Sequence, residues 1–139
     1  MFDKILLAND GSEGAGRALS AAINLAKTHG AALHMISVEE MPQFPASVDE
    51  VVEETLDANH RYEPVIAQAK AQAQAQGIRL ATHIVPGHAV ATIVDFIERE
   101  RFDLLVVGFM GHSALYNRLI GSTTDRLVEH APCNVLVIK

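Results

Sequence analysis

DLLVVG, at residues 103–108, indicates the fold class, because it is a continuous apolar run that ends at a glycine. Such runs are typical of strands that are buried on both faces of a parallel sheet. Other short runs with the same character lie on both sides of it in the sequence, and turn residues separate them. We predict five strands, at residues 4–8, 31–38, 78–85, 103–108 and 134–138.

The segments between these runs have helical patterns. Residues 13–29 carry apolar side chains at helical spacing, and Gly30 then supplies a typical C-terminal stop. Residues 47–76 have a helical composition, but Pro64 interrupts them, which predicts two helices or one kinked helix. We expect two further helices, one after a turn at Pro86-Gly87 and one at residues 121–130, and a loop at residues 39–46.

Alternating strands and helices indicate βαβ crossovers, and hence an α/β fold with a parallel sheet. The pattern predicts a doubly wound, five-stranded, Rossmann-like sheet in three layers, α/β/α. The 139 residues fit a single domain, residues 1–139. In such folds a ligand binds beyond the carboxyl ends of the strands, at the point where the winding reverses. This rule selects the loops after the first and fourth strands as candidate sites.

Composition argues against several classes of function. The net charge is -6 and aromatic residues make up 5% of the chain, so neither a basic patch nor a stacking surface for nucleic acid is evident. The first residues lack the pattern of a signal peptide, and no apolar run reaches the length of a membrane span, so we expect no membrane insertion and a cytoplasmic location. Cys133 is the single cysteine, which excludes an intrachain disulfide.

The loop after the first strand reads Ala8-Asn9-Asp10-Gly11-Ser12. Asp10 is a candidate to accept hydrogen bonds from a ribose or a base, or to hold a divalent cation such as Mg²⁺. Capping of the following helix is the alternative role for this residue. The glycines here have the spacing GxxGxG and not GxGxxG, which argues against NAD.

The loop after the fourth strand combines glycines with a hydroxyl-rich cluster. Gly108 and Gly111 allow a polyphosphate to approach the backbone, and the cluster at residues 121–124 (GSTT) opens a helix with amides and hydroxyls for an anion. No GK[ST] sequence is present, so this is not a Walker A loop. A plain loop followed by a capped helix explains the same residues, so both interpretations stay open on spacing alone.

The spacing G-x2-G-x9-G-[ST], formed by Gly108, Gly111, Gly121 and Ser122, resembles the nucleotide-binding signature of the universal stress protein family. The Asp-Gly-Ser run after the first strand and the ending APCNVLVI at residues 131–138 resemble that family too. The resemblance covers the whole chain and points to the ATP-binding subgroup. It implies a sheet like that of the adenine nucleotide alpha hydrolases and a homodimer joined through residues 134–138.

The resemblance also implies roles for individual residues. Contacts to the adenosine are expected from Ala8, Asn9 and Asp10, and Val38 is expected to meet adenine through its backbone. The nucleotide would further lie against Val107 and Gly108. Its phosphates would be approached by Gly111 and His112 and bound by Gly121, Ser122, Thr123 and Thr124.

Four other features bear on this site. Phe109 and Met110 are bulky and are expected to narrow the phosphate entrance. His112 is a candidate phosphate neighbour or an exposed loop residue, and Arg118 is a candidate phosphate ligand or a member of a surface ion pair. The seven histidines show no i, i+4 pair on a helix and no HExxH sequence, so Asp10 is the one candidate for a metal contact.

These observations favour a protein that binds ATP, ADP or AMP and responds to it, over an efficient enzyme. An efficient phosphoryl-transfer site neutralises charge at the γ-phosphate, and the sequence offers neither a P-loop lysine nor a pair of metal-binding carboxylates. One alternative is a slow Mg²⁺-dependent ATPase. Another is a nucleotide-independent protein that regulates a transporter or a stress pathway through a client of unknown identity.

Overall fold

The computed structural model describes residues 1–40, 48–109 and 120–139. These residues form a five-stranded parallel sheet with the strand order β3-β2-β1-β4-β5, together with four helices. The winding reverses between β1 and β4, which confirms the predicted doubly wound α/β fold. The elements are β1 (Lys4–Ala8), α1 (Glu13–His29), β2 (Ala32–Glu40), α2 (Val48–Ala75), β3 (Leu80–Gly87), α3 (Ala89–Glu100), β4 (Leu104–Gly108), α4 (Ser122–His130) and β5 (Asn134–Ile138).

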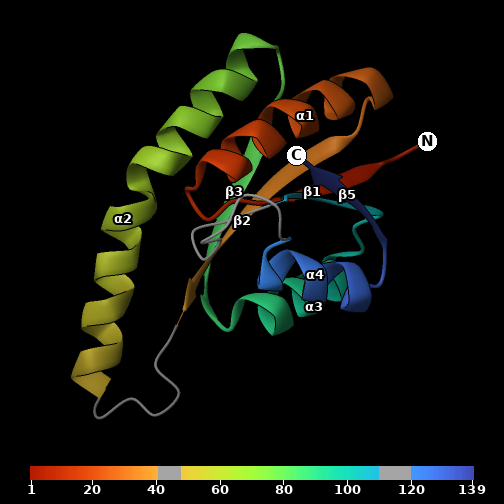
Figure 1. Ribbon diagram of the computed structural model, residues 1–139. Helices are drawn as coiled ribbons and strands as arrows, with labels where there is room; N and C mark the ends of the chain where they lie inside the picture. The colour runs from red at the N-terminus through yellow and green to blue at the C-terminus, as the bar shows by residue number, and fades with distance from the viewer. Residues whose placement is uncertain (41–47, 110–119) are drawn as a thin grey trace.

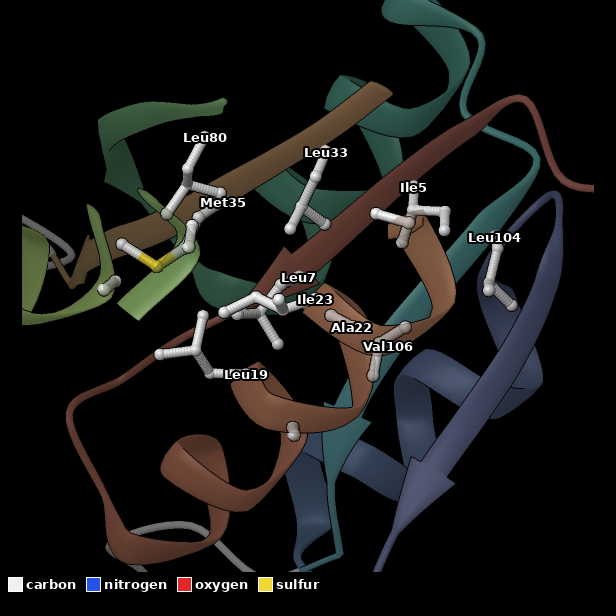
Figure 2. Packing of buried hydrophobic residues seen from close by; sticks show 14 residues of the cluster. Ile5, Leu7, Leu19, Ala22, Ile23, Leu33, Met35, Leu80, Leu104 and Val106 are labelled. Atoms are coloured by element: carbon white, nitrogen blue, oxygen red, sulfur yellow. The ribbon is translucent and has the colours of Figure 1, made fainter. Parts of the chain in front are cut away.

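The helices cover both faces of the sheet (Figure 1), with α1 and α2 on one face and α3 and α4 on the other. Alternation along each strand assigns neighbouring side chains to opposite faces. Leu7 of β1 packs with the α1 and α2 side (Figure 2), whereas Leu6 packs with Phe96 of α3 and Leu127 of α4. All of these side chains are buried, so the sheet separates two apolar cores.

Local signals fix both ends of α1, as the sequence predicts. The hydroxyl of Ser12 accepts a 3.2 Å hydrogen bond from the amide of Ala15 and caps the helix. Gly30 ends the helix in the left-handed conformation, with φ 64°, and its amide donates to the carbonyl of Ala26. The loop after β1 is therefore held against the start of a well-anchored helix.

Two predicted boundaries were wrong. The β2 strand continues to Glu40, where a loop was expected from residue 39, and β3 includes Pro86 and Gly87, where a turn was expected. The β3 strand lies at the edge of the sheet, so the missing amide of Pro86 costs no ladder hydrogen bond on its open side. Pro64 lies inside α2, so of the two arrangements expected for residues 47–76 the structure has a single helix.

No helix in the described ranges is both long enough and apolar enough to cross a membrane.

Candidate functional site

A cavity of about 280 Å³ lies beyond the carboxyl ends of the central strands, where the winding reverses. It is lined by the loop after β1 and the start of α1, by the ends of β2 and β4, by one residue of α2, and by residues from α3 and α4. Its lining residues are Ala8, Asn9, Asp10, Ser12, Ala15, Ile36, Val38, Glu40, Tyr62, Ala89, Ile93, Val107, Gly108, Gly121, Thr123, Thr124 and Leu127. The structure thus brings together nine of the residues that the sequence predicts for the site.

Asn9 holds the shape of the loop after β1. Its side-chain oxygen accepts a 2.9 Å hydrogen bond from the amide of Gly11, and its carbonyl accepts a 2.7 Å bond from the Ser37 hydroxyl. Its own amide donates to the carbonyl of Ile36 at 2.9 Å. Asn9 is only 6% exposed, so it lines the cavity mainly as a rigid part of the wall.

Asp10 is exposed at the edge of the cavity. One of its oxygens accepts a 2.9 Å hydrogen bond from the amide of Ser12, so the carboxylate stabilises the turn before α1 while Ser12 caps the helix itself. Among the described residues, no three His, Cys, Asp or Glu side chains gather as metal ligands. The predicted Mg²⁺ contact at Asp10 therefore belongs to no described cluster of metal ligands and stays a prediction.

Gly108 is required by packing as well as by any ligand. A Cβ atom at this position would lie 2.8 Å from the carbonyl carbon of Gly14 and 2.9 Å from its oxygen, which is closer than real Cβ contacts. The first turn of α1 therefore approaches the end of β4 only because residue 108 has no side chain. The sequence had suggested phosphate access as the reason for this glycine.

Two hydrogen bonds join the end of β4 to the start of α4. The amide of Gly121 donates to the carbonyl of Phe109 at 2.9 Å, and the Thr124 hydroxyl donates to the carbonyl of Gly108 at 2.7 Å. The hydroxyl hydrogen of Thr124 is thus used within the fold, and this side chain positions α4. The predicted phosphate-loop residues Gly111, His112 and Arg118, and also Met110, lie outside the described residues.

The N-terminus of α4 faces the cavity without a side-chain cap. Gly121 occupies the N-cap position, and no described side chain accepts a capping hydrogen bond there. The first-turn amides of a helix point away from it and carry its positive dipole end, which suits an anion. Thr123 and Thr124 line the cavity, whereas Ser122 is not among the described lining residues.

The Phe109 ring lies near the C-terminus of the chain. The Lys139 ammonium is 5.2 Å from its centroid, and Phe109 is not among the described residues that line the cavity. The Phe109 ring therefore forms no part of the described cavity wall, and the expectation for Met110 lies outside the described residues. The Phe109 amide donates to the carbonyl of Ile138 on β5 at 2.8 Å, so residue 109 extends the pairing of β4 with β5.

Sequence reasoning missed several lining residues because no local pattern marks them. Tyr62 reaches the cavity from the middle of α2, and its hydroxyl donates to the carbonyl of Val38 at 3.2 Å. Burial is the main cause that raises the pKa of Tyr62, which keeps the hydroxyl protonated. Glu40 lies at the end of β2, and its carboxylate accepts a 3.0 Å hydrogen bond from the amide of Ala89 at the start of α3.

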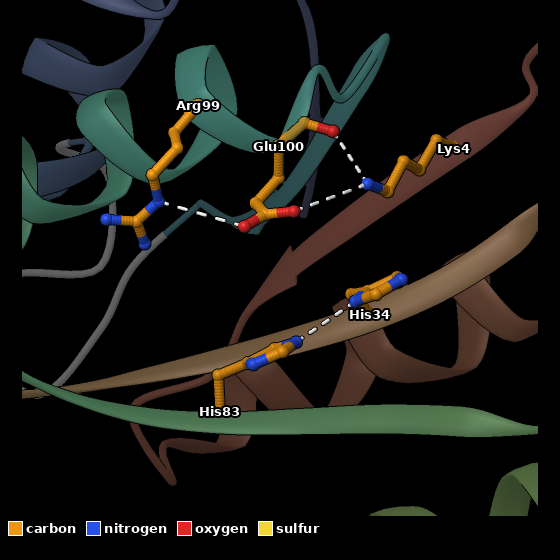
Figure 3. A network of polar contacts seen from close by, with 5 residues as sticks. All are labelled: Lys4, His34, His83, Arg99 and Glu100. Atoms are coloured by element: carbon orange, nitrogen blue, oxygen red, sulfur yellow. Dashed lines mark hydrogen bonds and ion pairs between the residues drawn. The ribbon is translucent and has the colours of Figure 1, made fainter.

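A second polar group lies on the α3 face of the sheet, and its residues are not among the described residues that line the cavity (Figure 3). His34 Nδ1 is 3.0 Å from His83 Nε2, and the Lys4 ammonium contacts the carbonyl of Glu100 at 2.6 Å. Burial is the largest cause that lowers the pKa of both histidines. A hydrogen bond between the two rings requires that one nitrogen carries a proton and the other does not.

The fold and the cavity together define a parallel α/β protein with a ligand site at the reversal of winding. The universal stress protein family model matches residues 1–139, and the chain belongs to this family. A universal stress protein of Methanocaldococcus jannaschii is 32% identical over 143 residues, which cover all of this chain and 83% of that relative.

Solved structures share the fold. The universal stress protein UspA of Lactobacillus plantarum matches with a TM-score of 0.88 and 33% identity, covering 99% of this chain and 98% of that one. A universal stress protein in complex with cAMP matches with a TM-score of 0.76 and 22% identity, covering 99% and 97%. One from Archaeoglobus fulgidus in complex with dAMP matches with a TM-score of 0.68 and 20% identity, covering 100% and 98%.

Proposed function

We propose that this protein binds an adenine nucleotide, ATP, ADP or AMP, in the cavity and responds to it as a regulator in stress resistance. One observation carries the proposal: a single cavity joins the open backbone edge of β2 to the uncapped N-terminus of α4. A nucleotide needs an apolar slot with polar groups for its base and an anion site for its phosphates. The two ends of this cavity supply them.

The base would lie at the β2 end. Ala8 and Ile36 form the last pair in the register of β1 and β2, so β2 extends beyond β1 toward the cavity. The amide and carbonyl of Val38 lie in this overhang. A backbone donor and acceptor side by side match the Watson–Crick edge of adenine, in which N1 accepts and the 6-amino group donates.

The phosphates would lie at the α4 end. The first-turn amides of α4 and the absence of a side chain at Gly121 allow an anion to approach the backbone closely. We expect Gly108, Gly111, His112, Arg118 and the segment 121–124 to surround the phosphates, as the family resemblance implies. The family members that were solved with cAMP and with dAMP support an adenine nucleotide as the class of ligand.

The site suits binding better than catalysis. The described lining residues include two carboxylates, Asp10 and Glu40, and no lysine or arginine. Backbone amides are therefore the main described groups that could stabilise the negative charge that develops on a phosphoryl group during its transfer. A slow Mg²⁺-dependent ATPase, with Asp10 near the metal, is the second candidate function, and a nucleotide-independent interaction protein is the third.

The proposal includes a homodimer. The β5 strand is at one edge of the sheet, and Leu136 on this strand is 36% exposed. An edge strand with apolar side chains is a surface that proteins usually cover, and a second copy of the same chain would do so. A bound nucleotide would influence this dimer surface through Phe109, whose amide bonds to Ile138 and so links the β4 end of the cavity to β5.

Mass spectrometry of the small molecules released when the purified protein is denatured tests both the site and the ligand. We expect an adenine nucleotide in near-stoichiometric amount, and calorimetry with ATP, ADP, AMP and cAMP would rank them. No retained nucleotide and no heat with any of the four would favour the nucleotide-independent protein. Steady release of phosphate from bound ATP, dependent on Mg²⁺, would favour the ATPase.

A further inference from the structure

Tyr62 is placed at the part of the cavity where a base would be read. It comes from α2, is 7% exposed, and lines the cavity together with Val38. Its hydroxyl donates a 3.2 Å hydrogen bond to the carbonyl of Val38. Tyr62 is thus both an apolar wall and a polar contact at this end of the site.

The direction of the Val38 backbone follows from the strand geometry. The carbonyl of Ile36 accepts from the amide of Asn9, so residue 36 points its backbone groups toward β1. Every second residue of a strand points these groups to the same side, so Val38 points toward β1 as well. The register of β1 with β2 ends at Ile36, so at Val38 no strand residue of β1 remains to pair with these groups.

The Tyr62 hydroxyl therefore supplies the hydrogen bond that the missing strand would have supplied. A desolvated carbonyl without a donor is costly, and the donor here belongs to the protein itself, so that no ligand is needed to supply it. A base with an amino group would offer a second donor, to the other lone pair of a carbonyl that no longer carries the penalty of having no donor. A base without an amino group would leave the same carbonyl with the Tyr62 hydrogen bond.

We propose that Tyr62 is a specificity-determining residue that weakens the discrimination of this site for the 6-amino group of a purine. The inference rests on the proposed nucleotide-binding function and concerns the recognition of the base alone. Its consequence is that the wild-type protein binds purine nucleotides with and without the 6-amino group with similar affinity. Removal of the hydroxyl makes the amino group the donor that the Val38 carbonyl requires.

Calorimetric titrations of two ligands into two proteins test this coupling. The ligands are ATP and purine riboside triphosphate, which carries hydrogen in place of the 6-amino group. The proteins are the wild type and Tyr62→Phe, which keeps the aromatic wall. We expect the ratio of the two dissociation constants to be within about threefold for the wild type and to rise by about tenfold in the variant.

Glu63→Gln is the matched control, because its carboxylate is on the same helix with a side chain that is 77% exposed. It should keep the wild-type ratio. An equal ratio in the wild type and in Tyr62→Phe would overturn the inference while leaving nucleotide binding intact. A wild-type ratio above about thirtyfold would overturn it without any variant. The absence of heat with both ligands in the wild type would overturn the proposed function, and this inference with it.

Discussion

The hydroxyl of Thr124 donates a 2.7 Å hydrogen bond to the carbonyl of Gly108, which ties the first turn of α4 to the last residue of β4. This side chain thus reinforces the backbone hydrogen bond from Gly121 to Phe109 in joining two elements on either side of residues 110–119. The N-terminus of α4 keeps its place at the cavity because of this contact. The anion site that we propose depends on it.

Thr124→Val should test this tie, because valine has nearly the same shape but no hydroxyl. The Gly108 carbonyl would lose its donor, so we expect the free energy of unfolding to fall by about 1–2 kcal/mol. ATP affinity should fall as well, since α4 is no longer fixed. Chemical denaturation and calorimetry would measure the two effects. Thr124→Ser keeps the hydroxyl and should retain most of the affinity; equal losses in both variants would contradict this role.

Gly108→Ala should destabilise the protein, since the new Cβ would lie 2.8 Å from the backbone of Gly14. Backbone atoms cannot rotate away, so α1 must shift, at a cost of about 1–3 kcal/mol. Gly16→Ala is the control, because Gly16 lies in α1 beside Gly14 but a Cβ there would meet nothing within 4 Å. That control should stabilise by about 0.5–1 kcal/mol, since alanine favours a helix over glycine. Thermal melts compare the two, and unchanged stability of Gly108→Ala would show that the approach of α1 is not tight.

Gly121→Asp should separate stability from binding. An aspartate at the N-cap position accepts from the free amides of α4 and interacts favourably with the helix dipole, which adds up to about 1 kcal/mol of stability. The same carboxylate would occupy and repel the phosphate site, so ATP affinity should fall at least about tenfold. Gly121→Ser, a neutral cap, should lose less affinity. Unchanged affinity in a folded Gly121→Asp protein would count against the anion site.

Stability should fall as the pH drops below about 6.5, because His34 and His83 lie partly buried beside each other. Their pKa values are lowered in the folded state, mainly by burial, so the unfolded chain binds more protons as the pH falls. The charge of Lys4 lowers the pKa of both histidines further, and His83 also lowers the pKa of His34. The carboxylate of Glu100 acts in the opposite direction and raises the pKa of both.

The measurement is the free energy of unfolding between about pH 7.5 and about pH 5. The double variant His34→Gln/His83→Gln should show a smaller loss over this range than the wild type. His60→Gln, in which the replaced side chain is 82% exposed, should keep the wild-type slope. Equal slopes in all three proteins would rule out the histidine pair as the cause.

Leu136→Lys should weaken the proposed homodimer, because it places a charge on the outer part of the edge strand β5. Light scattering coupled to size-exclusion chromatography would detect a shift toward the monomer. Val52→Lys replaces a more exposed apolar residue on α2 and should leave the mass unchanged. A monomeric wild-type protein would reject the dimer itself.

Most of the fold could be predicted from the sequence because it is determined by local patterns. The apolar run at residues 4–8, the polar cluster that follows it and the stop at Gly30 set the bounds of β1 and α1 without reference to other parts of the chain. Residues 104–108 and 134–138 were equally clear as strands. The rule for parallel sheets then pointed to the loops after β1 and β4. The loop after β1 lines the cavity, as do Gly108 at the end of β4 and Gly121 at the start of α4.

Only the tertiary structure decided the rest. Pro86 could remain in a strand because β3 lies at the edge of the sheet. The residues next to Pro86 in the sequence do not indicate that β3 is an edge strand. Residue 108 must be a glycine because the backbone of α1 at Gly14 passes close to it. These two residues are more than 90 positions apart in the sequence. Tyr62 reaches Val38 because α2 lies beside the end of β2. Periodicity along a chain encodes which face of an element is buried, whereas the partner that buries it is fixed when the sheet is assembled.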